Sequence, residues 1–322
     1  MKKSNHWGWW ALLAFTTVLP LFITGTYHRH LMVMAAISII MASGLNLIVG
    51  FMGELSLGHS AYFGIGAYAS TLVVMKLGMP VWIGFAMAGV IGGIFGFLIG
   101  YPSLRLRGPY FAISTLGFVM ILHLIVINWE ALTNGPMGIV GIPSAAISLP
   151  FLKFKFTSKV SYYYLVLAFT WAVLFVIHRI INSRMGRAFL ACRENEELAR
   201  SVGIHVFRFH LVAFIIGTCF ISLAGGLYAH YMSFLDPEVF TWYYIVTMLI
   251  MVLIGGPGTI AGPVIGAILF TWLPEYLRAV KSFQMVFYGL ILVVAIIFMP
   301  EGIYGSMKQF YSQRIGRERA PS

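Results

Sequence analysis

Residues 81–100 read VWIGFAMAGVIGGIFGFLIG, a run of twenty residues without a single charge. A transmembrane α-helix needs about 20 consecutive apolar residues, whereas a membrane β-strand needs about 10 with alternating polarity. Similar runs recur throughout this chain of 322 residues, of which 60% are hydrophobic and only 10% are charged. Because helices and closed barrels alone satisfy the backbone polar groups inside a bilayer, the sequence predicts an all-α fold, a polytopic bundle of membrane-spanning helices.

The apolar runs predict about ten spans in a single transmembrane domain, residues 1–306, followed by a basic tail at 307–322. The amino-terminal run, within residues 1–25, has the basic start of a secretory signal, but no convincing small-residue cleavage site follows it. We therefore expect a retained first helix. The other nine runs lie near residues 31–50, 56–76, 81–100, 110–128, 161–180, 208–230, 241–256, 258–275 and 284–300.

Lysine and arginine are distributed unevenly between the loops. With the amino terminus inside, about two-thirds of the 21 basic residues fall on cytoplasmic loops, as the positive-inside rule requires. This arrangement predicts a multi-pass protein of the prokaryotic inner membrane with both termini in the cytoplasm. The net charge is +11, but the basic residues flank the apolar spans instead of forming the single basic stripe typical of a nucleic-acid-binding surface. We therefore expect a lipid bilayer, and no nucleic acid, as partner. The two cysteines, Cys192 and Cys219, are expected to be free thiols.

One stretch, GELSLGHSAYFGIGAYAS at 53–70, interrupts the apolar pattern. It carries Glu54, Ser56, His59 and Ser60 within seven positions, and an acid near membrane depth is costly unless it faces protein, water or an interface. Gly53 and Gly58 permit a turn, after which Ser56 or Ser60 would cap a restarting helix. The alternative is an ordinary cytoplasmic turn, with Glu54 among the lipid headgroups and His59 hydrogen-bonded inside the bundle.

A second stretch rich in glycine and proline, LIGGPGTIAGPVIGAILF, covers residues 253–270. Interrupted helices in transporters form substrate sites or hinges, so we expect broken or re-entrant segments near 54–76 and 255–275. Close helix packing through small residues is the alternative explanation. The candidate hinge or packing glycines are Gly53, Gly58, Gly255, Gly256, Gly258 and Gly262.

The longest polar cytoplasmic loop is about 181–207. Apolar Phe189, Leu198 and Val202 alternate there with charged residues, which predicts one or two short amphipathic helices that end at Gly203. Such a loop is either a docking surface for a partner or a solvated loop.

Three stretches carry a specific resemblance: 43–70, 183–204 (SRMGRAFLACRENEELARSVGI) and 253–267. They are similar to regions of LivM-type permeases, the membrane subunits of ABC importers for branched-chain amino acids. The resemblance implies that the polar loop couples the permease to an ATPase. It places the ATPase-coupling residues at Arg187, Arg193, Glu196, Glu197, Ala199 and Gly203, although this chain has EELA where the general motif has two consecutive alanines.

The resemblance also implies partners. No G-x-x-x-x-G-K-[ST] motif occurs in the chain, so the ATP site is expected on other subunits. The implied assembly contains two ABC ATPase subunits, a second homologous permease and an extracytoplasmic substrate-binding protein. No catalytic residue, cofactor or metal site is expected on this chain itself.

Candidate pathway residues are polar groups inside the predicted bundle, and each has a bundle hydrogen bond as its alternative role. They are Asn46, Glu54, Ser56, His59, Ser60, Ser114 and Thr115. The main alternative function is an ion-coupled secondary transporter in which Glu54 and His59 relay protons. An intramembrane enzyme is disfavoured because the remaining acids are sparse and lie near span ends. Within the family, other amino acids, urea, amides and small carboxylates remain alternative substrates.

Overall fold

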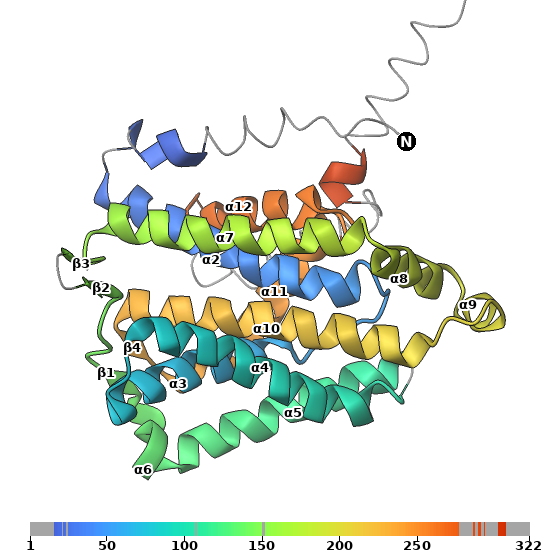
Figure 1. Ribbon diagram of the computed structural model, residues 1–322, viewed down its shortest axis with the longest axis horizontal. Helices are drawn as coiled ribbons and strands as arrows, with labels where there is room; N and C mark the ends of the chain where they lie inside the picture. Colours follow the sequence, from blue (N-terminus) through green and yellow to red (C-terminus); the bar gives the residue numbers. More distant parts are fainter. Residues whose placement is uncertain are drawn as a thin grey trace, which may run out of the picture.

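The computed structural model describes residues 16–20, 22–23, 25–106, 108–149, 152–276 and 302–306, together with residues 286, 289, 290 and 293. Long helices lie side by side in a bundle (Figure 1). They match eight of the ten expected spans: α2 (Thr26–Val49), α3 (His59–Leu77), α4 (Val81–Ser103), α5 (Pro109–Asn128), α7 (Lys159–Ile181), α10 (Val206–Met232), α11 (Trp242–Gly255) and α12 (Ala261–Tyr276). The first and last expected spans, and the tail at 307–322, lie largely outside the described residues.

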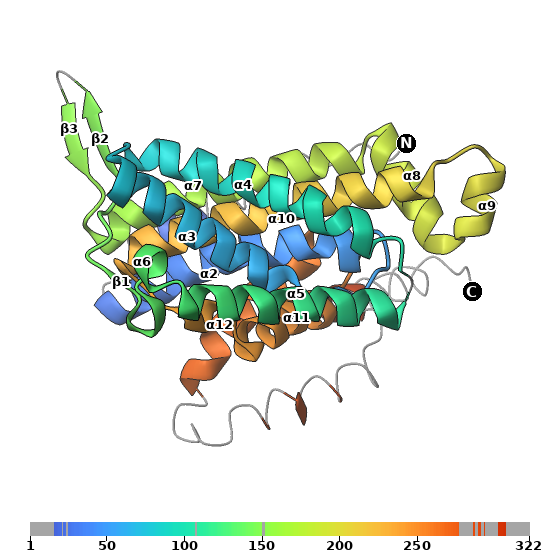
Figure 2. The same ribbon diagram turned by 90° about the horizontal axis from the view of Figure 1, so that it is seen from below.

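The short elements gather at the two ends of the bundle. One end, which we call the β-hairpin end, carries α6 (Glu130–Thr133), η1 (Gly135–Met137), η2 (Pro237–Phe240) and four short strands. The strands β1 (Ile139–Val140) and β4 (Phe234–Leu235) pair antiparallel, as do β2 (Ala146–Leu149) and β3 (Leu152–Lys155). The opposite end, the α9 end, carries α8 (Arg184–Glu194) and α9 (Glu196–Ser201), which project beyond the long helices (Figures 1 and 2). The strands are a small addition to the expected all-α fold.

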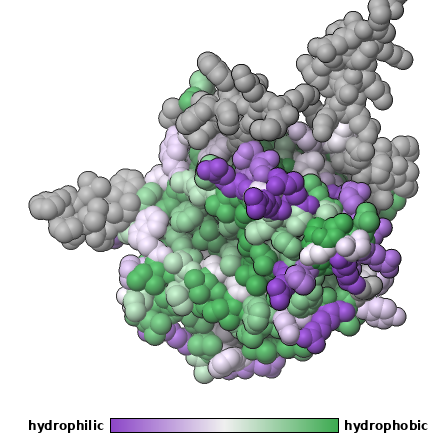
Figure 3. Space-filling view, turned by 45° about the vertical axis from the view of Figure 1, so that its right-hand side comes forward, coloured by the Kyte–Doolittle hydropathy of each residue, from purple (hydrophilic) through white to green (hydrophobic). Residues whose placement is uncertain are grey.

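The surface of the bundle suits a membrane. Five described helices are long and apolar enough to cross a bilayer, namely α2, α4, α5, α7 and α10, while α11 and α12 are shorter apolar helices. In α5 only 28% of the most apolar window is buried inside the chain. Hydrophobic residues, in green, cover much of the described surface visible in Figure 3, and hydrophilic residues gather in patches towards its right-hand side.

At the centre of the bundle, α10 packs against α2, α3 and α4. Small residues allow the close approach: a Cβ on Gly66 would overlap the carbonyl of Ser222, and one on Gly225 would overlap that of Phe63. Membrane helices associate through such small-residue contacts because lipid supplies no hydrophobic drive between them. Most residues of α3 are buried in this packing.

Both expected interruptions are present. The chain is not helical between Val49 and His59, nor between Gly255 and Ala261. After the second interruption, α12 has 16 residues, and α11 before it has 14. At 1.5 Å per residue α11 is about 21 Å long, shorter than the ~30 Å hydrocarbon core, and α12 is described as far as Tyr276. We call the two interrupting segments, residues 50–58 and 256–260, the first and second inner turns.

Candidate functional site

The two inner turns meet beside Asn46, which is buried near the end of α2. Its side-chain Nδ2 donates a hydrogen bond to the carbonyl of Thr259 at 2.8 Å, and its Oδ1 accepts one from the N–H of Gly258 at 3.0 Å. Both halves of one amide therefore hold the second inner turn against α2. This contact ties the start of the α11–α12 hairpin loop to α2, while α11 and α12 also pack directly on each other.

Arg193, near the end of α8, reaches the same place. Its Nη1 donates a hydrogen bond to the carbonyl of Gly50 at 2.7 Å. The guanidinium also lies against Gly258, where an added Cβ would overlap it and where φ is +74°, a conformation that favours glycine. We call Asn46, Gly50, Arg193, Gly258 and Thr259 the inner junction.

The first inner turn leads from this junction back into the bundle. The Oγ of buried Ser56 accepts the N–H of Gly58 at 3.4 Å, and the N–H of Leu57 donates to Thr115 Oγ1 at 3.2 Å. Gly58 is the N-cap of α3, and no side chain accepts a capping hydrogen bond there. The expectation that Ser56 or Ser60 caps this helix was therefore wrong, because Ser56 lies two residues before the cap and Ser60 lies inside the helix.

Buried polar side chains continue along α3. Both ring nitrogens of His59 and the hydroxyls of Ser60, Tyr62, Tyr68 and Thr71 have no hydrogen-bond partner among the described residues. The His59 ring packs edge-on against Phe214, with centroids 5.5 Å apart. The alternative in which His59 is hydrogen-bonded inside the bundle is thus not found in the part of the chain that the structure describes.

Glu54 lies beside the polar loop at about 181–207, which we call the coupling loop after its expected role. One carboxylate oxygen of Glu54, one of Glu196 and a ring nitrogen of His210 all lie within 4.8 Å of one another. Glu54 is half-buried, Glu196 also binds Arg200, and His210 is 6% exposed. Glu54 is therefore placed among protein groups of the α9 end.

The other two candidates, Ser114 and Thr115, have bundle hydrogen bonds. Ser114 Oγ donates to Ser103 Oγ at 3.0 Å, and Thr115 Oγ1 donates to the carbonyl of Ala112 at 2.9 Å. Thr115 also joins the first inner turn, whereas Ser114 is paired with α4. The structure thus brings Asn46, Ser56 and Thr115 to the inner turns, and places His59 and Ser60 in the first turn of α3.

The six candidate glycines fall into two groups. Gly53, Gly256 and Gly258 have positive φ, while Gly58, Gly255 and Gly262 lie where a Cβ would crowd neighbouring atoms. Gly255 and Gly262 face each other across the α11–α12 hairpin. The glycines of the second group are therefore closely packed. That any of the six glycines acts as a hinge stays a prediction.

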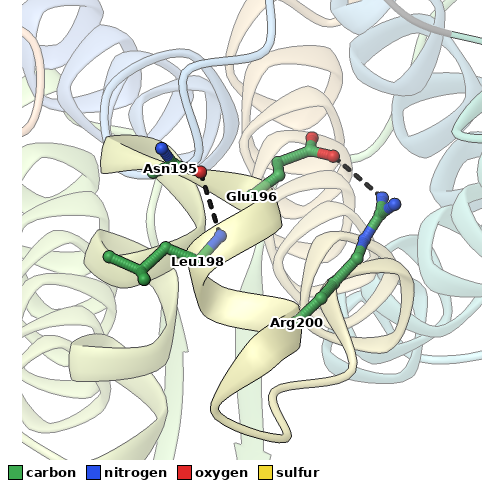
Figure 4. Close-up of polar contacts among 4 residues, drawn as sticks. All are labelled: Asn195, Glu196, Leu198 and Arg200. Atoms are coloured by element: carbon green, nitrogen blue, oxygen red, sulfur yellow. Dashed lines mark hydrogen bonds and ion pairs between the residues drawn. The ribbon is translucent and has the colours of Figure 1, made fainter.

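The coupling loop folds into two short helices, as its pattern predicts. Ser183 caps α8 by accepting the N–H of Met185 at 3.1 Å, and Asn195 caps α9 by accepting the N–H of Leu198 at 3.0 Å (Figure 4). Gly203, with φ of +84°, ends the second helix, where the N–H of Ile204 donates to the carbonyl of Ala199 at 3.0 Å. Local capping chemistry is sufficient to account for both boundaries.

This loop presents apolar residues to solvent. Leu198 is 64% exposed and Val202 is 69% exposed, while Ala199 is buried on the inner side of α9. Glu196 and Arg200, one turn apart, form an ion pair at 2.9 Å (Figure 4). Arg187 and Glu197 are exposed.

Three partners in this region were not among the sequence candidates: Thr259, Arg200 and His210. The contact between Asn46 and Thr259 joins residues more than 200 positions apart, so no local sequence pattern predicts it. The ion pair of Arg200 has a signal in the sequence, the i, i+4 spacing from Glu196.

Comparison with known proteins assigns the family. The model of the family "Branched-chain amino acid transport system / permease component" matches residues 29–296. The high-affinity branched-chain amino acid transport system permease protein LivM of Escherichia coli is 35% identical over 313 residues, which are 91% of this chain and 73% of that protein. LivM of Salmonella typhimurium is 34% identical over 312 residues, with the same coverage.

A third relative, the permease protein LivH of the same E. coli system, is 26% identical over 300 residues, 83% of this chain and 90% of LivH. No solved structure matches the chain. The family match spans every helix described here from α2 to α12, including both inner turns and the coupling loop. The chain belongs to the family of permease components of branched-chain amino acid transport systems.

Proposed function

We propose that this chain is the membrane-spanning permease subunit of an ATP-driven ABC importer, which translocates branched-chain or related amino acids delivered by an extracytoplasmic binding protein. The observation that carries the proposal is the coupling loop: α8 and α9 project from one end of an apolar bundle, in a chain of this family, with Leu198 and Val202 exposed. Exposed apolar side chains on a charged helix pair suit a groove on a partner.

The partners follow from the family and from the missing ATP motif. Two ABC ATPase subunits bind and hydrolyse ATP, and a second homologous permease completes the pathway. The binding protein docks at the β-hairpin end. The ATPases contact this chain through its coupling loop, about residues 181–207, with Arg187, Arg193, Glu196, Glu197, Ala199 and Gly203 as the coupling residues.

In the membrane, residues 1–306 form the permease domain, and both termini and the basic tail at 307–322 are cytoplasmic. The described arginines at the α9 end support this orientation, because Arg105, Arg179, Arg184, Arg187, Arg193, Arg200 and Arg208 all lie in or beside its loops. This end faces the cytoplasm of a prokaryotic cell, and the membrane is the inner membrane.

The pathway is proposed to pass residues of the inner turns and the start of α3: Asn46, Glu54, Ser56, His59, Ser60, Ser114 and Thr115. The unpartnered polar atoms of His59 and Ser60 support this placement, because buried polar groups without partners are rare in proteins and concentrate where function requires them. Ser114 has the weakest support, since it already pairs with Ser103.

Transport then follows a two-state cycle. ATP binding brings the ATPases together and displaces the coupling loops, and the permease pair changes between an outward-open and an inward-open arrangement. The energy of ATP binding favours one arrangement over the other, so the substrate is released because its binding groups separate.

The test is purification of the tagged full chain in mild detergent, identification of its stoichiometric partners, and uptake by the reconstituted complex. We expect two ATPase chains, a second permease, and ATP-dependent uptake of labelled leucine that excess isoleucine and valine reduce more than urea does. Recovery of the chain alone, with uptake that needs no ATP and stops with an uncoupler, would instead establish the ion-coupled carrier.

A further inference from the structure

Arg193 is exposed on the coupling loop, yet its guanidinium also reaches back to the bundle at Gly50. We propose that Arg193 is a positioning residue that links α8 to both inner turns, so that residues 50–58 and 256–260 move together with the coupling loop. The part of this inference that concerns transport rests on the proposed function, whereas the mechanical link concerns this chain alone.

The first step is the contact between Arg193 and Gly50. A guanidinium is permanently charged, and its hydrogen bond to a carbonyl is stronger than one between neutral groups. The bond at 2.7 Å joins residues 143 positions apart, from a helix that also packs on α7 and α10 through buried Phe189. Arg193 therefore anchors the end of α8 to the end of α2.

The second step is the absence of space around that bond. A Cβ on Gly50 would overlap Asn46 Oδ1 and the backbone nitrogen of Gly258, and a Cβ on Gly258 would overlap the guanidinium of Arg193. Gly50 and Gly258 are thus in backbone contact, with one long side chain packed over them. Arg193 as a whole is exposed, but its guanidinium touches the backbone of both glycines, so a shift of that group displaces both turns.

The third step is the Asn46 amide. It bonds the second inner turn on both its donor and acceptor sides, so the turn cannot follow Arg193 without α2. The inner junction consequently joins three segments, α8, the end of α2 and the second inner turn, through two side chains.

A separate contact supports the link to the first inner turn. Glu54, in the middle of that turn, lies with Glu196 of α9 and His210 of α10 within 4.8 Å of one another. The Arg200 guanidinium, 2.9 Å from Glu196, offsets the repulsion between the two carboxylates. The coupling loop thus touches the first inner turn at its beginning and at its middle, and His59 begins α3 at the end of the same turn.

The test compares amide hydrogen exchange in Arg193→Gln with that in the unaltered full chain, both purified with their partners and embedded in lipid nanodiscs. We expect about tenfold faster exchange at residues 50–54 and 256–260, the effect of losing one charge-assisted hydrogen bond. Arg193→Lys keeps a donor and a charge, and is expected to restore part of the protection.

Arg184→Gln is the matched control. Arg184 lies on the same helix, is exposed and is assigned to no site, so the same loss of charge should leave both inner turns unchanged. Faster exchange in both turns with Arg193→Gln, and not with Arg184→Gln, would support the link. Unchanged exchange in the inner turns would overturn the link, even if Arg193→Gln lowered uptake. Such a loss of uptake would then come from an effect of Arg193 at the surface that contacts the ATPase.

Uptake gives the second readout. In reconstituted complexes, Arg193→Gln should lower the number of substrate molecules transported per ATP hydrolysed while the KM for substrate changes little, because Arg193 touches no proposed substrate group. A normal transport ratio would overturn the coupling role. If the unaltered complex showed no ATP-dependent uptake, the proposed function would fail, and the exchange comparison would still decide whether Arg193 positions the turns.

Discussion

At the scale of single residues, the inner junction shows how one polar side chain fixes two remote segments. Asn46 is 2% exposed, and each polar atom of its amide has a backbone partner in the second inner turn. A buried amide that is fully bonded contributes little on balance, but it is expensive to mismatch, because the remaining groups then lose their partners without regaining water.

Asn46→Asp tests this asymmetry. The carboxylate accepts the Gly258 N–H but leaves the Thr259 carbonyl facing an acceptor, so we expect a loss of about 1–3 kcal/mol and a lower melting temperature in detergent. The control is Asn128→Asp, since the exposed Asn128 makes only a local hydrogen bond to Leu124 and should shift stability by less than about 0.5 kcal/mol. Equal melting temperatures for the two variants would show that the amide does not hold the turn.

At the scale of helices, α3 and α10 cross closely because small residues line both sides of the contact. Gly66 faces the backbone of Ser222, and Ser222 Oγ donates to the carbonyl of Tyr62 at 2.7 Å. The crossing therefore combines close backbone packing with a hydrogen bond between helices, the usual means by which membrane helices associate.

Gly66→Ala is expected to weaken this crossing. The added methyl group has no space against Ser222, and overpacking of this kind costs about 1–3 kcal/mol. Gly117→Ala on α5 is the matched control, because among the described residues no atom outside its own helix lies within 4 Å of the new methyl group, and alanine favours a helix by up to about 1 kcal/mol. The stability of each variant is measured as the fraction of protein that stays monodisperse after heating. Equal monodisperse fractions of Gly66→Ala and Gly117→Ala would contradict the close packing of α3 against α10.

At the scale of the whole molecule, the α9 end and the β-hairpin end differ in charge and in shape. The α9 end carries most of the described arginines, which predicts that it faces the cytoplasm. Two valines provide a matched pair for testing this orientation, since Val140 at the β-hairpin end and Val202 at the α9 end are each 69% exposed.

In cells that express the chain without its ATPase partners, which are proposed to cover Val202, a membrane-impermeant maleimide should modify Val140→Cys in intact cells, and Val202→Cys only after the membrane is opened. The native thiols give little background: Cys192 and Cys219 are free, and burial, with the nearby Glu196, raises the pKa of the Cys192 thiol above its usual range. A thiol with a raised pKa is less often the reactive thiolate. The reverse labelling pattern would invert the proposed topology.

The positions of the helices could be predicted from the sequence, because the length of each apolar run is set by the bilayer and not by tertiary contacts. The coupling helices could be predicted for a local reason too, since Ser183, Asn195 and Gly203 supply their caps. The inward orientation of Arg193 could not, because it depends on where Gly50 lies after 143 intervening residues have folded. The same holds for Glu54, whose neighbours Glu196 and His210 come from two other elements.

The buried polar side chains of α3 also have a consequence for how the protein is made. Among the described long helices, α3 is missing from those apolar enough to cross a bilayer by themselves, and its polar groups are covered mainly by α10. More than 100 residues of chain separate α3 from α10, so at the ribosome α3 emerges long before the helix that shields it. We therefore expect α3 to insert stably only once the second half of the polypeptide is present, and a chain truncated before Val206 should leave α3 a target for quality-control proteases.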